Sequence, residues 1–137
     1  MQLAHGTDRD HLVIHPGLCL VVSDTDPSVV DEAVLDRAAA YGRERDAAFC
    51  VHRFDLDLAD DNLVVERVEV DLRAALDGEG FPGDRQEEID AYLARGIDAI
   101  RFVDADPRGV AHETLRVFSA RALRSLTVIE VLTADDF

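Results

Sequence analysis

The chain of 137 residues has no tryptophan, one methionine, and no lysine among its 14 basic residues, which are all arginine. Against 29 acidic residues these leave a formal net charge of −15. A surface that follows a nucleic-acid backbone needs clustered positive side chains, and this composition would repel phosphates instead. We therefore expect no direct binding to a nucleic-acid backbone.

Long hydrophobic runs are also lacking. No apolar run is longer than that from Leu18 to Val22, whereas a helix needs about 20 apolar residues to span a bilayer. The first residues, from Met1 to Thr7, have neither the basic nor the apolar part of a secretory signal. These absences predict a cytoplasmic protein without a membrane partner.

Cysteine is scarce as well. Cys19 and Cys50 both stand in apolar stretches, where a free cysteine behaves as a small buried hydrophobic residue. A disulfide is not expected in a cytoplasmic protein, and no Cys/His spacing resembles a zinc site. We predict two buried thiols and no metal site.

The acidic residues are mostly aspartate, 20 against 9 glutamates. High negative charge keeps proteins soluble where salt screens self-repulsion, as in halophiles. This composition predicts a halophilic source, so that the environment explains much of the charge. An acidic mimic of nucleic acid would carry a similar charge and stays open as an alternative.

What is present indicates one folded domain. Apolar residues make up 47% of the chain, which excludes intrinsic disorder, and the length is typical of a single domain. No linker divides residues 1–137. We predict strands at 2–4, 18–22, 48–58, 99–103, 114–118 and 126–132, helices at 27–45 and 86–95, a helical turn at 8–14, a turn at 120–123, and an ambiguous segment at 63–70.

The order of these elements predicts an α+β fold. The helix at 27–45 is expected to begin at Asp26, a good N-cap, followed by Pro27 at the first helical position. Val34, Ala38 and Tyr41 lie at helical spacing on its inner face.

Three stretches, each weak alone, carry a family resemblance when they are taken in order. They are Leu3-Ala4-His5-Gly6-Thr7; Pro16-Gly17-Leu18-Cys19-Leu20 with Asp26-Pro27 and Ala40-Tyr41; and Gly96-Ile97-Asp98-Ala99-Ile100-Arg101-Phe102 with Glu113-Thr114-Leu115-Arg116-Val117-Phe118-Ser119. Together they span most of the chain and resemble small histidine-type members of the ADP-ribosyltransferase family. The resemblance implies a mixed or antiparallel split sheet with flanking helices.

The resemblance also implies a substrate and a reaction. NAD would be bound, and its ADP-ribose transferred to an unknown macromolecular acceptor or released by cleavage. The family's first motif implies that His5 contacts a ribose and that the Gly6 backbone holds the carboxamide of nicotinamide, with Thr7 adding a hydroxyl. Only glycine permits such a close approach of the backbone.

Two positions depart from the family pattern. The strand at 18–22 has no tyrosine, so Ser23 or Thr25 would supply the hydroxyl and Tyr41 would stack on the nicotinamide. The catalytic acid of the pattern falls on Thr114, and Glu113 stands one residue earlier. Because side chains alternate along a strand, this offset points Glu113 to the opposite face unless a bulge intervenes.

These observations leave three hypotheses. The first is an NAD-binding ADP-ribosyltransferase-like enzyme with Glu113 as the catalytic residue. The second is a catalytically degenerate member of the same fold that serves as a binding or interaction module, supported by the missing tyrosine and the displaced glutamate. The third is the acidic mimic. His112 is a further candidate in a loop, and Asp104 is expected to be a solvated acid.

Overall fold

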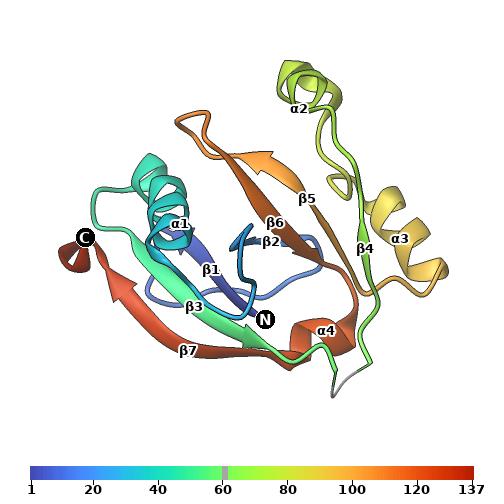
Figure 1. Ribbon diagram of the computed structural model, residues 1–137, viewed down its shortest axis with the longest axis horizontal. Helices are drawn as coiled ribbons and strands as arrows, with labels where there is room; N and C mark the ends of the chain where they lie inside the picture. The colour runs from blue at the N-terminus through green and yellow to red at the C-terminus, as the bar shows by residue number, and fades with distance from the viewer. Residues whose placement is uncertain (60–61) are drawn as a thin grey trace.

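Seven strands form one mixed sheet in the computed structural model, which describes residues 1–59 and 62–137 (Figure 1). The strand order is β4-β5-β6-β2-β1-β3-β7, and only β4 and β5 run parallel. The strands are β1 (Gln2–Thr7), β2 (Leu18–Val22), β3 (Cys50–Leu56), β4 (Val65–Arg67), β5 (Ala99–Ala105), β6 (Ala111–Val117) and β7 (Leu126–Thr133). The α+β prediction is confirmed.

The sheet is split between β1 and β2. These strands share a single pair, Ala4↔Val21. By contrast, β1 pairs with β3 from Gln2↔Asp55 to Thr7↔Cys50, and β2 pairs with β6 along its whole length. The two halves of the sheet therefore diverge from this junction.

Helices pack on both parts of the split sheet. They are α1 (Glu32–Arg45), α2 (Leu72–Ala74), α3 (Gln86–Ala94) and α4 (Ala120–Ser125), with short helical turns at Ala75–Glu79 and Ala134–Asp136. Apolar residues of β1, β2, β3 and β6 form the main core on one side of the sheet, and α1 closes a second core on the other side. In the described part of the chain, no helix is both long and apolar enough to cross a membrane.

Helix α1 lies unusually close to β1. A Cβ atom on Gly6 would stand 1.8 Å from the carbonyl oxygen of Ala38 in the helix. Glycine is therefore required at this position for packing, because any side chain would push the helix off the strand.

Two predicted boundaries are wrong for local reasons. The helix starts at Glu32 and not at Pro27, because the Asp26 carboxylate closes a tight turn with the Ser28 amide (3.0 Å). Asp31 is the N-cap instead, and it accepts a hydrogen bond from the Val34 amide. The stretch His5–Thr7, which lies beyond the predicted end of the first strand, continues β1 because β3 pairs with it throughout.

Three smaller expectations also differ from the structure. The helical turn at 8–14 is an irregular loop, and the turn at 120–123 is helix α4. The ambiguous segment at 63–70 contains the short strand β4. The remaining strands lie where the sequence predicts them, within a few residues at each end.

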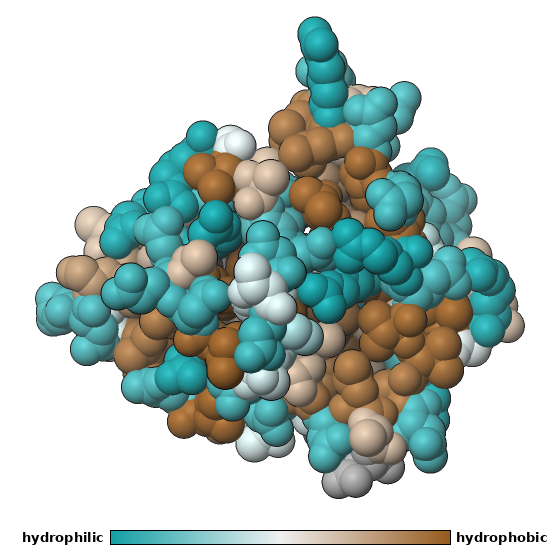
Figure 2. All heavy atoms as spheres, viewed as in Figure 1, coloured by the Kyte–Doolittle hydropathy of each residue, from teal (hydrophilic) through white to brown (hydrophobic). Residues whose placement is uncertain are grey.

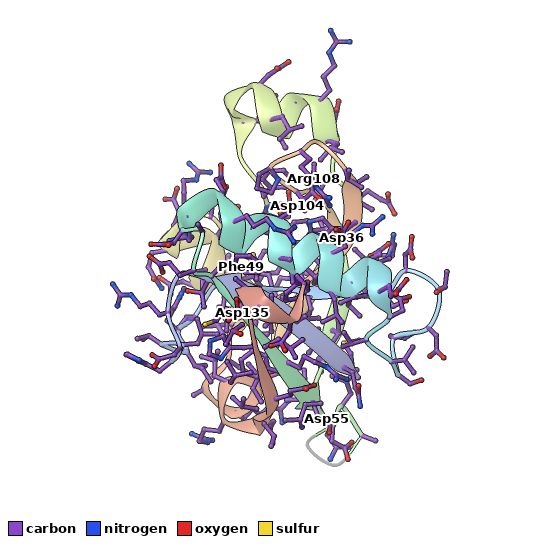
Figure 3. All side chains as sticks on the ribbon, turned by 90° about the vertical axis from the view of Figure 1, so that its left-hand side faces the viewer. Asp36, Phe49, Asp55, Asp104, Arg108 and Asp135 are labelled. Carbon is purple, nitrogen blue, oxygen red and sulfur yellow. The ribbon has the colours of Figure 1, made fainter. Side chains whose placement is uncertain are left out.

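Arginines are interspersed with the acidic side chains over the surface of the described chain (Figure 3). Arg108 in the turn after β5 joins Asp36 of α1 at 2.9 Å and Asp106 at 2.6 Å. Such pairs neutralise part of the charge locally, but 29 acids against 14 arginines leave a net charge of −15 uncompensated.

This imbalance predicts that the protein is more stable in salt. We expect the melting temperature to rise with KCl, most steeply between about 10 mM and 1 M, where the Debye length falls from about 30 Å to about 3 Å. Thermal melting followed by circular dichroism at several KCl concentrations measures the effect. Repeating the series with an uncharged osmolyte separates screening from solvent exclusion, and a melting temperature independent of KCl would contradict the prediction.

Candidate functional site

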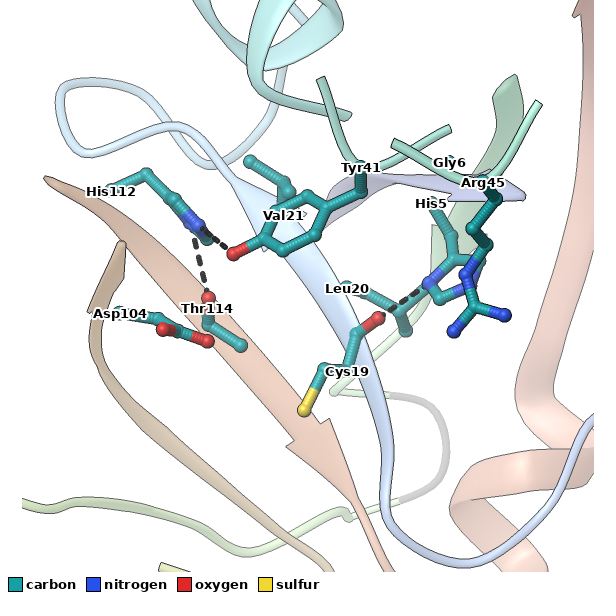
Figure 4. Close-up of a pocket in the computed structure, with 10 residues that line it drawn as sticks. All are labelled: His5, Gly6, Cys19, Leu20, Val21, Tyr41, Arg45, Asp104, His112 and Thr114. Atoms are coloured by element: carbon teal, nitrogen blue, oxygen red, sulfur yellow. Dashed lines mark hydrogen bonds between the residues drawn. The ribbon is translucent and has the colours of Figure 1, made fainter. Parts of the chain in front are cut away.

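A pocket of about 100 Å³ opens where the sheet splits (Figure 4). Strands β1, β2, β5 and β6 and helix α1 each contribute to its wall. The lining residues are His5, Gly6, Cys19, Leu20, Val21, Tyr41, Arg45, Asp104, His112 and Thr114. Of the residues predicted for the site, His5, Gly6 and Tyr41 therefore come together here.

His5 reaches the pocket from the middle of β1. Its Nδ1 lies 2.7 Å from the carbonyl oxygen of Cys19, and because a carbonyl only accepts, Nδ1 carries the proton. Burial lowers the pKa of His5, and the hydrogen bond to Cys19 only partly opposes this. The ring is therefore neutral near pH 7, and Nε2, which bonds to no residue in the described chain, is left as an acceptor for a ligand.

Tyr41 and His112 form a hydrogen-bonded pair across the pocket. The Tyr41 hydroxyl lies 2.6 Å from Nε2 of His112, and His112 Nδ1 lies 3.1 Å from the Thr114 hydroxyl (Figure 4). The same Nδ1 lies 3.1 Å from the Glu113 carbonyl, to which it donates. The Tyr41 hydroxyl also donates to the carbonyl oxygen of Ala105 at 3.0 Å, so the single Tyr41 proton is shared between Ala105 and His112 Nε2. Burial is the main cause that raises the pKa of Tyr41, which keeps the hydroxyl protonated.

Asp104 provides the carboxylate that lines the pocket. It stands directly across the β5–β6 ladder from His112, and its Oδ1 accepts a hydrogen bond from the Ala105 amide at 2.6 Å. Burial raises the pKa of Asp104, although the Ala105 amide and the nearby positive groups oppose the rise. The expectation that Asp104 is a solvated acid is therefore wrong, because β5 continues to Ala105 and carries Asp104 into the sheet.

Glu113 lies outside the pocket. No bulge interrupts the pairing of β6 with β2, so Thr114 faces the pocket and Glu113 the other side of the sheet. There it meets Arg67 at 2.9 Å and Arg101 at 3.2 Å. Burial raises the pKa of Glu113, but these two guanidinium groups outweigh it and hold the pKa below its usual value.

Thr7 and Ser23 also lie outside the pocket. The Thr7 hydroxyl donates to Asp8 at 3.3 Å. Ser23 is buried, and its hydroxyl oxygen accepts hydrogen bonds from the Thr25 and Asp26 amides. Ser23 therefore organises the loop before α1 and presents no hydroxyl to the pocket.

A second, more open cleft of about 400 Å³ adjoins the pocket. The two share His5, Cys19 and Arg45, and the loop between β1 and β2 forms the outer wall of the second. Arg45 makes no ion pair with any described residue, although the chain carries 29 acids. An unpaired guanidinium between two connected hollows suits an anionic group.

Cys19 lines both hollows, and its thiol forms no disulfide. Burial raises the pKa of this thiol to about 11, so it is protonated near neutral pH and is a poor nucleophile. The prediction of buried thiols holds for Cys50, whereas Cys19 is only partly buried.

No family model matches this chain, and neither the curated proteins nor the solved structures contain a significant match to it.

Proposed function

We propose that the protein binds NAD at the split of the sheet and breaks the bond between nicotinamide and ribose. One observation carries the proposal: His5 and Tyr41, from two of the three stretches that resemble ADP-ribosyltransferases, line one pocket at the junction of β1 and β2. The resemblance implies a split sheet, and this is where the sheet divides.

The dimensions of the two hollows suit a ligand with a small ring at one end. The pocket of about 100 Å³ is smaller than the cavity of about 150 Å³ that accepts benzene, so nicotinamide would enter it only in part and would extend into the adjoining cleft. The adjoining cleft of about 400 Å³ would receive the ribose and the pyrophosphate. Arg45, at the passage between them, would pair with the phosphates.

Asp104 is the carboxyl group best placed for the reaction, because Glu113 is held by two arginines on the other side of the sheet. In cleavage by water, the C–N bond to nicotinamide breaks with its electron pair leaving on the ring nitrogen. Water forms the new C–O bond, and its proton passes to the ionised Asp104. The products are nicotinamide and ADP-ribose, and Asp104 then returns the proton to solvent.

The second candidate is a binding module of the same fold that holds NAD without cleaving it. The position of Glu113 favours it, since the carboxylate of this candidate acid is held by Arg67 and Arg101. Measuring NAD binding and nicotinamide release separately distinguishes the two candidates.

The test is NAD affinity by calorimetry in molar KCl, followed by nicotinamide release in the same buffer. We expect His5→Ala and Tyr41→Phe each to weaken NAD binding about tenfold, because the first removes a polar contact with the ligand and the second removes the hydroxyl that holds His112 in the pocket wall. Tyr92→Phe is the matched control, since Tyr92 stacks on Phe118 away from the pocket. Thermal melting of each variant shows whether the fold is intact.

The results have three outcomes. Binding that weakens in His5→Ala and Tyr41→Phe but not in Tyr92→Phe supports the site, and release of nicotinamide by the wild type supports the enzyme. Binding without release supports the module. Absence of NAD binding by the folded wild type would refute both.

A further inference from the structure

Strand β7 is the outermost strand on one side of the sheet and is long for an edge strand. It runs from Leu126 to Thr133, and its only strand partner in the described chain is β3 on the inner side. Val128, Ile129 and Val131 are exposed by 48%, 46% and 40%. An exposed apolar edge strand offers unpaired backbone groups to another strand.

The two faces of β7 differ in chemistry. On one face Val128 and Val131 stand opposite Phe54 and His52 of β3. The other face borders an open groove of about 920 Å³ between β7 and α1. Figure 2 shows apolar surface broken by polar side chains along this edge of the molecule.

The groove combines apolar and acidic side chains. Leu35, Leu132 and Phe137 supply its apolar wall. Its charged residues are Glu32, Asp36, Glu130 and Asp136, against Arg37 and Arg53. Arg53 already pairs with Glu130 at 2.6 Å, and Asp36 pairs with Arg108 at 2.9 Å. Glu32 and Asp136 then stand against Arg37, so the groove keeps one excess negative charge.

Natural proteins protect edge strands with lysine, proline or bulges. Strand β7 contains neither lysine nor proline, and its one irregularity is a register shift opposite Arg53 and Phe54. The segment beyond this shift, from Glu130 to Thr133, pairs regularly with β3 on its inner side and has an open outer side.

We propose that the outer edge of β7 accepts an extended segment of a partner protein in which apolar and basic side chains alternate. Side chains of an added strand point alternately to the two faces. Basic side chains would enter the acidic groove with their aliphatic stems on Leu132 and Phe137, and apolar ones would cover Val128 and Val131. The proposal is independent of NAD binding.

Electrostatic repulsion favours a basic partner segment at β7 over a second copy of the chain. Two copies, each with a net charge of −15, would repel each other at low salt, whereas a basic segment is attracted. Pairing with a basic segment therefore weakens as salt is added, and pairing between two copies strengthens.

The experiment uses a fluorescent peptide of alternating arginine and valine, as long as β7, with the full-length protein. Fluorescence anisotropy at low salt measures its affinity, and hydrogen exchange locates it. We expect binding that weakens with KCl and new protection of amides within Leu126–Thr133. A peptide of alternating glutamate and valine, and an arginine–valine peptide with N-methylated backbone, should both fail to bind.

A matched pair of variants tests the location. Val131→Lys places a charged side chain on the face that the apolar side chains of the peptide would cover, and it should weaken peptide binding about tenfold, because covering the ammonium group removes it from water without a partner. Val110→Lys, at a similarly exposed valine (38%) in the turn between β5 and β6, should leave binding unchanged. The proposal is overturned if Val131→Lys binds as tightly as the wild type, if the acidic peptide binds equally well, or if protection appears only elsewhere. It is also overturned if β7 mediates a dimer that excludes the peptide.

Discussion

Replacing Asp98 by asparagine is expected to lower the free energy of unfolding by about 3 kcal/mol. Asp98 is only 4% exposed, and its carboxylate accepts hydrogen bonds from Arg121 at 2.6 and 2.8 Å and from the Val64 amide at 2.8 Å. Asparagine has nearly the same shape, but it carries no charge and presents an NH₂ group to these donors. The variant thus leaves buried polar groups unpaired.

The same contacts make the stabilisation depend on pH. Hydrogen bonding from Arg121 is the main cause that holds the pKa of Asp98 well below its ordinary value of 3.8, against the opposing effect of burial. A carboxyl with a lowered folded-state pKa stabilises the protein fully above its unfolded pKa, and the contribution disappears as pH falls through the folded pKa. The difference between wild type and Asp98→Asn should therefore be largest near neutral pH and shrink below about pH 3.8.

Urea unfolding at several pH values measures both effects. Asp24→Asn is the control, because Asp24 is exposed in the loop before α1 and such surface changes alter stability by less than about 0.5 kcal/mol. Equal unfolding midpoints for Asp98→Asn and wild type at neutral pH would show that the Arg121 contact contributes nothing to stability.

The parts of this fold that depend on local pattern could be predicted from the sequence. Leu18 to Val22 is a short apolar run between turn residues, and it forms β2 with the predicted bounds. Alternation along β6 predicts that Glu113 faces away from Thr114, and the two arginines that hold Glu113 lie on that other side. Both inferences need only the period of a strand.

The parts that depend on tertiary contacts could not be predicted. Gly6 suggests close approach to a ligand, but the backbone that approaches it belongs to Ala38 of α1, a contact set by helix packing. Asp26 and Asp31 are equally good N-caps by composition, and only the Ser28 turn decides between them.

Errors in the predicted ends of two strands explain why the acidic side of the pocket could not be predicted from the sequence. The sequence predicts that β5 ends at Val103 and that the next strand begins at Thr114, which leaves Asp104 and His112 in a loop. In the structure both strands are longer, and the two residues form a cross-strand pair that faces Tyr41. Hydrophobic periodicity marks strand ends poorly where polar and apolar residues are mixed. The sequence alone therefore does not show that Asp104 and His112 are paired; the strand register does.

Because Asp104 is the carboxylate that faces the pocket, its replacement carries the largest expected effect. If the proposed cleavage of NAD occurs, Asp104→Asn should slow nicotinamide release by about 10²- to 10⁴-fold, the range typical of a lost general base. NAD affinity should change little, because asparagine keeps the shape of the side chain. Glu113→Gln removes a carboxylate that lies outside the pocket. Comparing the release rates of the two variants therefore shows which of the two candidate acids takes part in the reaction.

The pH dependence of nicotinamide release tests the role of Asp104 more specifically than the slower release by Asp104→Asn does. Asp104 accepts a proton only when ionised, and burial raises its pKa above the ordinary 3.8. The wild-type rate should therefore fall as the solution is acidified through this raised pKa, at a higher pH than an exposed aspartate would give. Asp90→Asn, on the exposed side of α3, should keep this acid limb, whereas any residual release by Asp104→Asn should lack it. A wild-type rate that is lost in Glu113→Gln but retained in Asp104→Asn would instead return the catalytic role to Glu113. It would also require Glu113 to leave Arg67 and Arg101 when NAD binds.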